Sequence, residues 1–254
     1  MILLTTGVFV RNRLKRIGSH TYEATAISAD CKNVAIVGLA DFTIFEVSSS
    51  FEVKVICWGD ITQRYAFQPK QAIEQRSILS YHRAALTDEI IAIASFESFI
   101  DIRNAKTGQR IHQLRLEVQS NIRAIVFSPD GQHLAVGLKT GDIFVYHAGL
   151  KFEFSAPPIR VRYDHESPIT SITISHDSLL MAASTEDNIV RAYRFLNLSD
   201  GHFEEWVQPV QYGSRNKPAP ISDLALCSPV FLSNVVYSTR TPYTWWAAIE
   251  KPHP

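Results

Sequence analysis

Apolar residues come in short runs separated by polar turns through most of the chain, and the clearest series lies between residues 122 and 148. The run IRAIVF at 122–127 is mostly apolar, as expected of a β-strand that is covered on both faces. Ser128-Pro129-Asp130-Gly131 forms a turn, because proline presets the backbone, aspartate bonds local amides and glycine tolerates a positive φ. Two further strands, HLAVGL at 133–138 and IFVY at 143–146, flank a second turn at 139–142. The series therefore predicts an antiparallel meander.

This series recurs along the chain. Segments 24–47, 81–110, 169–194 and 221–240 each carry a version of it, aligned on a serine or threonine after the first strand. These marker residues, spaced 59, 41, 47 and 53 residues apart, are Ser28, Thr87, Ser128, Ser175 and Ser228. Repeats of about 40–50 residues with four strands each are typical of β-propellers. The sequence predicts an all-β fold of four-stranded antiparallel blades. About five units are visible, forming either a small closed ring or part of a seven-bladed ring.

The repeats also set the expected domain organisation. One propeller-like domain is expected over residues 1–254, with units near 20–57, 78–115, 120–155, 167–208 and 219–250. Insertions are expected at 58–77, with a short helix at 70–76, and at 201–220, which is rich in turn-forming residues and should be mostly irregular. Residues 1–10 are expected as an outer strand of the last blade, and YTWWAAI at 243–249 as the third strand of the fifth unit.

The units resemble WD (Trp-Asp) repeats. The resemblance rests on SPDG at 128–131, LAVG at 134–137, an aspartate shortly before a strand, and NAKTGQR at 104–110, all in the expected order. No unit ends in Trp-Asp and none opens with Gly-His, so the hydrogen-bonded His–Ser/Thr–Asp–Trp support of a strict WD blade is incomplete. The overall style is similar to divergent WD-like regions in large fungal proteins, and a fragment of such a protein is one interpretation.

Composition narrows the class of partner. Lys plus Arg and Asp plus Glu both number 25, so the formal net charge is zero, which disfavours a general binder of nucleic acid or anionic membranes. Cys31, Cys57 and Cys227 are far apart without a CxxC pair, which predicts reduced, mostly packed thiols. No apolar run approaches the roughly 18 residues of a membrane span, and no secretory signal is recognised. The expected location is the cytoplasm, with the nucleus as the alternative.

Few residues suggest chemistry. His133 and His147 stand at a strand start and a strand end, and their spacing of fourteen matches no metal motif, so they are interpreted as turn or packing histidines. Ser175-His176-Asp177 has the residue types of a catalytic triad but is sequential in a turn, which indicates a structural role. Asp41 and Asp187 are expected in the turns between second and third strands, where they would hold hairpins.

The first strand of each unit, innermost in a propeller, argues against catalysis. The segments AISA, AALT, AIVFS, SITIS and LALCS carry almost no acids or histidines, whereas a channel enzyme needs several. The sequence also lacks GxSxG, GxxxxGK[ST], GxGxxG and HExxH. The chain is therefore predicted not to be an enzyme and to use no cofactor or metal.

The leading hypothesis is a non-catalytic protein–protein interaction scaffold that holds a partner with its propeller faces and loops. The alternatives are a lactonase- or glycosidase-like propeller hydrolase with a channel site, and an incomplete propeller without independent function. The expected partner is a protein rather than nucleic acid, a membrane or a small-molecule substrate. The predicted contact residues lie in the 58–77 insertion and are Trp58, Arg64, Tyr65 and Phe67.

Overall fold

The computed structural model describes residues 22–38, 41–50, 52–61, 83–94, 98–149, 154, 156–161, 167–197, 202–211, 223–226, 233–237 and 245–248. Side chains are described as far as Arg194, and beyond it the description covers the backbone of the strands. Every regular element in these residues is a β-strand, and the strands form five antiparallel sheets. Each sheet is called a blade here, numbered one to five in chain order.

Blade one comprises β1 (Tyr22–Ile27), β2 (Asn33–Gly38), β3 (Asp41–Val47) and β4 (Val53–Asp60). Blade two comprises β5 (Arg83–Leu86), β6 (Ile90–Ala94), β7 (Phe99–Asn104) and β8 (Arg110–Arg115). Blade three comprises β9 (Ile122–Phe127), β10 (His133–Leu138), β11 (Ile143–His147) and β12 (Ile159–Val161). Blade four comprises β13 (Ile169–Ile174), β14 (Leu180–Thr185), β15 (Ile189–Asn197) and β16 (His202–Gln211). The described strands of blade five are β17 (Asp223–Leu226), β18 (Ser233–Tyr237) and β19 (Trp245–Ala248).

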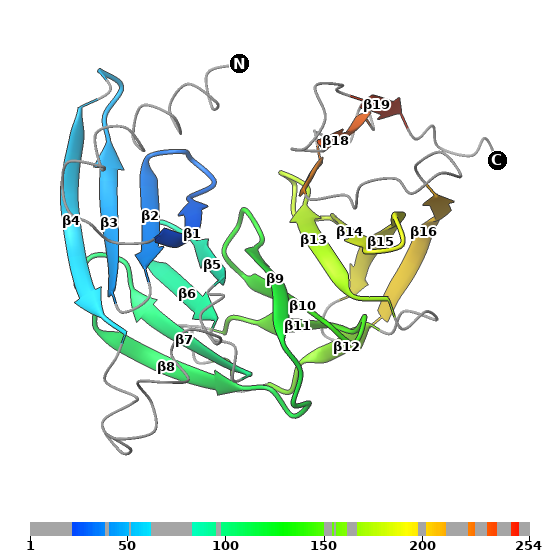
Figure 1. Ribbon diagram of the computed structural model, residues 1–254, viewed down its shortest axis with the longest axis horizontal. Coiled ribbons are helices and arrows are strands. Elements are labelled where there is room, and N and C mark those ends of the chain that lie inside the picture. The colour runs from blue at the N-terminus through cyan, green and yellow to red at the C-terminus, as the bar shows by residue number, and fades with distance from the viewer. Residues whose placement is uncertain are drawn as a thin grey trace.

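The blades stand side by side in chain order. Within each blade every strand pairs with the next one in sequence, and the first strands β1, β5, β9, β13 and β17 contact one another in turn. Figure 1 shows these first strands on the inner side of an arc, with β4, β8, β12 and β16 at the outside. This arrangement confirms the predicted all-β fold of four-stranded antiparallel blades.

Apolar side chains between neighbouring blades form the core. The cluster between blades two and three includes the fully buried Ile100, Ile102, Leu134 and Val136, and similar clusters join blades one and two and blades three and four. Blades three and four pack closely at Gly137, where an added Cβ would lie 2.6 Å from Cγ2 of Ile169. Close packing of this kind makes adjoining blades a single continuous interior rather than a string of separate sheets.

The strands predicted between residues 122 and 148 are confirmed. β9 and β10 have the predicted bounds, and β11 extends one residue further, to His147. The turns before β10 and β11 place Gly131 at φ +71° and Gly141 at φ +88°, which explains why glycine occupies both positions. Within YTWWAAI, β19 is the third described strand of blade five, as predicted.

Two predictions are wrong. Residues 202–211 are not irregular, because they form β16 and pair with β15. Their Pro209 is compatible with a strand because β16 is the edge of its sheet, where proline is tolerated. Asp41 does not lie in a turn, because pairing with Asp60 extends β3 to that residue. Asp187 does lie in the predicted turn, where its carboxylate accepts a hydrogen bond from Thr185 Oγ1.

The insertion predicted at 58–77 begins later than expected, since Trp58 to Asp60 belong to β4. The helix predicted within this insertion, at 70–76, lies outside the described residues. The same holds for the outer strand predicted at 1–10. Of the predicted packed thiols, Cys57 is buried and Cys31 is exposed. Cys31 takes a positive φ of 60° in the turn after β1, so its side chain projects from the turn instead of entering the core.

Candidate functional site

The turn between the first and second strands has the same hydrogen bonds in blades one, three and four. In each, a serine hydroxyl donates to the carboxylate of an aspartate two residues later and accepts the N–H of the residue five positions on, at 2.9–3.0 Å. The aspartate Oδ1 also accepts the N–H two residues beyond itself, at 2.9–3.1 Å. The pairs are Ser28 with Asp30, Ser128 with Asp130, and Ser175 with Asp177. These local bonds satisfy the turn amides and fix the hairpins.

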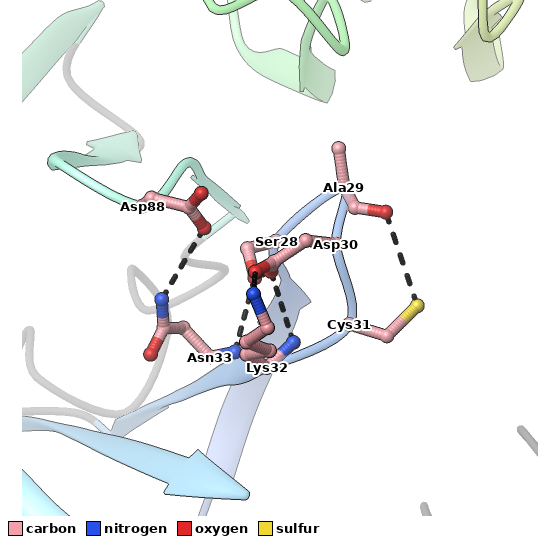
Figure 2. Close-up of polar contacts among 7 residues, drawn as sticks. All are labelled: Ser28, Ala29, Asp30, Cys31, Lys32, Asn33 and Asp88. Atoms are coloured by element: carbon pink, nitrogen blue, oxygen red, sulfur yellow. Dashed lines mark hydrogen bonds and ion pairs between the residues drawn. The ribbon is translucent and has the colours of Figure 1, made fainter. Parts of the chain in front are cut away.

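Blade two has a shorter version of this turn. Thr87 Oγ1 accepts the N–H of Ile90 at 3.0 Å, so Thr87 occupies the role of the serine. The aspartate that follows, Asp88, accepts a hydrogen bond from Asn33 Nδ2 of blade one at 3.3 Å. Figure 2 shows Asp88 facing Asn33 across the gap between the two blades, next to the self-contained turn of Ser28 and Asp30.

A pocket of about 540 Å³ lies where these turns meet at the inner end of blades one, two and three. Part of its wall is apolar and comes from the ends of β1, β5 and β9, including Leu86 and Phe127. Its polar lining includes three acidic residues, Asp88, Glu89 and Asp130. We call this site, with its apolar wall and its three acids, the acidic pocket. Apolar walls with a few polar groups are typical of binding pockets.

The turns around the acidic pocket carry an excess of negative charge. Their acids are Asp30, Asp88, Glu89, Asp130 and Asp177, against one base, Lys32. Lys32 Nζ lies 2.9 Å from Asp30 Oδ2, so its charge is largely matched by that carboxylate. Burial alone would raise the pKa of Asp30, but hydrogen bonds from Ser28 and Lys32 and the charge of Lys32 outweigh it and lower that pKa to about 2. The turn of blade one therefore keeps the negative charge of Asp30 at neutral pH.

At the opposite ends of the first strands, two arginines join neighbouring blades. Arg83 Nε, on β5, donates to the Arg123 carbonyl of β9 at 2.8 Å, and the Arg123 guanidinium pairs with Glu186 of blade four at 2.6 Å. These two contacts join blades two, three and four at that end.

Of the predicted contact residues, the structure describes Trp58, which does not line this pocket. Trp58 lies on β4, the outermost strand of blade one, and its side chain is 74% exposed. Arg64, Tyr65 and Phe67 lie outside the described residues. Their role in partner binding stays a prediction. The exposure of Trp58 is unusual for so large an apolar side chain and fits that prediction.

The triad-like residues have the structural role that was expected. Ser175 Oγ donates to Asp177 and accepts the Leu180 N–H, so the hydroxyl and carboxylate stabilise the turn. His133 and His147 are brought into direct contact across β10 and β11. Within the described residues there is no group of three or more His, Cys, Asp or Glu placed to hold a metal ion. The same residues contain no helix long and apolar enough to span a membrane.

The three acids of the pocket were not identified from the sequence as a site. Their signal was present, because each follows the marker serine or threonine of its unit by one or two residues. A repeat places equivalent positions at equivalent places in a propeller. Acids that recur just after the innermost strand must therefore gather around one end of the axis.

Comparisons with known proteins match two parts of the chain to WD40 family models. Residues 85–153 match the model of the anaphase-promoting complex subunit 4 WD40 domain, and residues 156–194 match the WD domain, G-beta repeat. U3 small nucleolar RNA-associated protein 21 of Saccharomyces cerevisiae is 27% identical over 126 residues, which cover 49% of this chain and 13% of that protein. Cilia- and flagella-associated protein 251 of Pongo abelii is 24% identical over 158 residues, which cover 62% of this chain and 12% of that protein.

The chain thus spans about an eighth of the length of these two relatives. Among solved structures, Kluyvelomyces marxianus Hsv2 aligns with a TM-score of 0.49 and 14% identity, over 87% of this chain and 74% of that one. The matched repeat models and the four-stranded blades support a divergent WD-repeat family for this chain.

Proposed function

We propose that the chain is a non-catalytic protein–protein interaction scaffold, and that the acidic pocket holds a basic segment of its partner. WD-repeat domains generally mediate protein–protein interactions and are typically non-catalytic. The observation that supports a basic partner is the acidic pocket, whose apolar wall suits the alkyl stem of a lysine or arginine. Its carboxylates suit the charged head of the same side chain.

The negative charge around the acidic pocket also bears on which classes of partner are excluded. Nucleic acid and anionic membranes present dense negative charge, which the acids around the pocket would repel. We therefore propose a protein partner and no nucleic acid or membrane ligand. The name of one relative connects it with a small nucleolar RNA and that of the other with cilia and flagella. Because these names point to different places, we keep the cytoplasm as the proposed location, with the nucleus as the alternative.

A propeller hydrolase is the second candidate, and one observation favours it. Three carboxylate residues line one pocket, and glycoside hydrolysis uses a pair of carboxyl groups. Two of the three already have structural partners, because Asp130 accepts bonds within its turn and Asp88 accepts one from Asn33. Of the three acids, Glu89 alone has no such structural bond. Because glycoside hydrolysis needs a pair of carboxyl groups, we rank binding above hydrolysis. Turnover of a lactone or aryl-glycoside panel, lost in Glu89→Gln, would reverse that order.

The test is quantitative affinity capture from cell extract, with mass spectrometry of the bound proteins. The test variant is Asp88→Lys/Glu89→Lys, and the matched control is Glu52→Lys, an exposed acid in the turn between β3 and β4. A partner held by the pocket should be captured by the wild type and by the control, and should fall about tenfold or more with the double variant. Equal recovery with all three proteins would reject the pocket as the binding site.

A second capture experiment tests the predicted residues of the β4 edge and the following segment. Trp58→Ala should weaken partner capture while leaving the thermal unfolding midpoint nearly unchanged, because the side chain is exposed. Capture that is unaffected by both Trp58→Ala and a deletion of 62–77 would remove this region from the proposed interface. A lower unfolding midpoint for Trp58→Ala would show that the side chain has a packing role instead.

A further inference from the structure

A pair of histidines in blade three has no counterpart in the neighbouring blades. His133 begins β10 and His147 ends β11, and the two residues are directly opposite each other in the antiparallel register. The equivalent pairs in blades one, two and four are Asn33 with Glu46, Ile90 with Asn104, and Leu180 with Arg194. The repeat therefore does not require histidine at either position.

The position of the two histidines in the antiparallel ladder brings their side chains close together. The Ala148 N–H donates to the Gln132 carbonyl, so Gln132 and Ala148, next to the histidines, form a hydrogen-bonded pair of the ladder. The His133 carbonyl instead accepts the Ser128 N–H on the other side of β10. His133 and His147 thus form a non-hydrogen-bonded pair, the type in which opposite side chains lie closest.

The contact between the rings has the spacing of two ligands on one metal ion. His133 Nε2 and His147 Nδ1 lie 3.3 Å apart, with ring centroids 5.1 Å apart and an interplanar angle of 39°. Two nitrogens bound to tetrahedral zinc, with bonds of about 2.05 Å and an angle of about 109°, are separated by roughly 3.3 Å. Hydrogen bonds from N–H groups are commonly shorter, at about 2.9–3.0 Å.

The pair is buried on one side and open to solvent on the other. His133 is 7% exposed and His147 is exposed, so the first ring is held by the core and the second faces the water from which an ion would arrive.

We propose that His133 and His147 form a two-histidine binding site for a divalent transition-metal ion such as Zn²⁺ or Cu²⁺, with water completing the coordination. Imidazole is a preferred ligand of these ions, and Cu²⁺ binds nitrogen ligands more tightly than Zn²⁺. Asp130, three residues before His133 in the chain, contributes negative charge that favours a cation. The site lies where β10 begins and β11 ends, next to the turn at 128–132, and the proposal does not depend on the function proposed above.

The test is titration of the full chain with ZnCl₂ and with CuCl₂, followed by calorimetry and by NMR of ¹⁵N-histidine-labelled protein. The test variant is His147→Ala, whose exposed position should leave folding intact, and the matched control is His176→Ala in the exposed turn of blade four. The wild type and His176→Ala should each bind one equivalent of metal that His147→Ala does not bind. The two imidazole resonances that move on metal addition should be those absent from His133→Asn and His147→Ala.

Two further outcomes decide between a metal site and a simple contact between rings. Lowering the pH from about 7.5 to about 5.5 should release the bound ion, because protons compete for both nitrogens. A wild type that binds no more metal than His147→Ala would overturn the proposal and leave a hydrogen-bonded histidine pair. Metal that binds equally to His147→Ala and wild type but shifts other histidine resonances would overturn it as well.

Discussion

The turns of blades two and three perform the same task with different numbers of residues. In blade three, Ser128 and Asp130 satisfy each other and the turn amides, so the hairpin is complete within its own sequence. In blade two, Thr87 alone holds the shorter turn, and the following aspartate is not used by the hairpin. That aspartate, Asp88, bonds Asn33 of blade one instead.

The difference shows how a repeat can change the use of one residue without changing the fold. A carboxylate that closes its own turn stabilises one blade, whereas a carboxylate freed by a shorter turn can contact a neighbouring blade or a ligand. Asp88 and Glu89 lie in the shorter turn, and both line the acidic pocket. The shorter turn of blade two thus leaves two acids outside its own hairpin bonds, at the place where three blades meet.

The largest expected effect is on the hydroxyl of the longer turn. Ser128→Ala removes the acceptor for the His133 N–H and the donor to Asp130, in a residue that is 2% exposed. Leaving a buried N–H without a partner should reduce the free energy of unfolding by about 2 kcal/mol. Urea unfolding followed by tryptophan fluorescence measures the change, and Ser128→Thr is the control that keeps the hydroxyl. An unaltered midpoint in Ser128→Ala would mean that water replaces the hydroxyl in this turn.

The aspartate of the longer turn should matter less than the serine and more than its counterpart in blade two. Asp130→Ala removes the acceptor of the exposed Gln132 N–H and of the Ser128 hydroxyl, and should cost roughly 1 kcal/mol in the same urea experiment. If Asp130→Ala were as stable as the wild type, the self-contained character of the longer turn would rest on Ser128 alone.

The turn of blade one offers a test by pH. The pKa of Asp30 is lowered to about 2 in the folded chain from an ordinary value of 3.8, so its ionised form favours folding. Its contribution to stability is present above about pH 4 and is lost as the pH falls toward 2. Asp30→Asn should therefore show a smaller loss of stability between pH 4 and pH 2 than the wild type. Identical acid-unfolding curves would contradict the bonds assigned to this carboxylate.

The smallest effect is expected for the bond between blades one and two. Asp88→Ala removes a single hydrogen bond of 3.3 Å between exposed groups, so the free energy of unfolding should change by less than about 0.5 kcal/mol. Asn33→Ala is the partner control, and the double variant should be no less stable than the sum of the two single changes. A loss near that of Asp130→Ala would place Asp88 among the structural residues and weaken its assignment to the pocket.

The parts of the fold that were predictable are those fixed by neighbouring residues. Pro129, Asp130 and Gly131 each favour the same turn through their own backbone and side chain, so the flanking strands could be placed almost to the residue. Thr87 could be aligned with the serines because a threonine hydroxyl accepts the same amide bond. The strand at 202–211 was missed because turn-forming residues around it obscured a pairing that β15 supplies.

The candidate sites depend on parts of the chain that lie far apart in sequence. The acidic pocket needs the ends of β1, β5 and β9 together, and no single repeat contains it. The histidine pair is different, because a turn centred on residue 140 lies midway between His133 and His147 and already implies that they face each other. Linear metal motifs do not reveal this contact, because a hairpin brings together residues at any separation that is symmetric about its turn.

The pairing of each strand with the next one in sequence also determines how the chain can fold during synthesis. A ribosome adds about 5–20 residues per second, so a blade of about 40 residues emerges within roughly 2–8 seconds. Every partner that blade one needs for its sheet, from β1 to β4, has by then left the exit tunnel. The apolar face of each finished blade is then available for the next blade to pack against. A nascent chain that stalls between blades should therefore expose far less unpaired backbone than one that stalls within a blade.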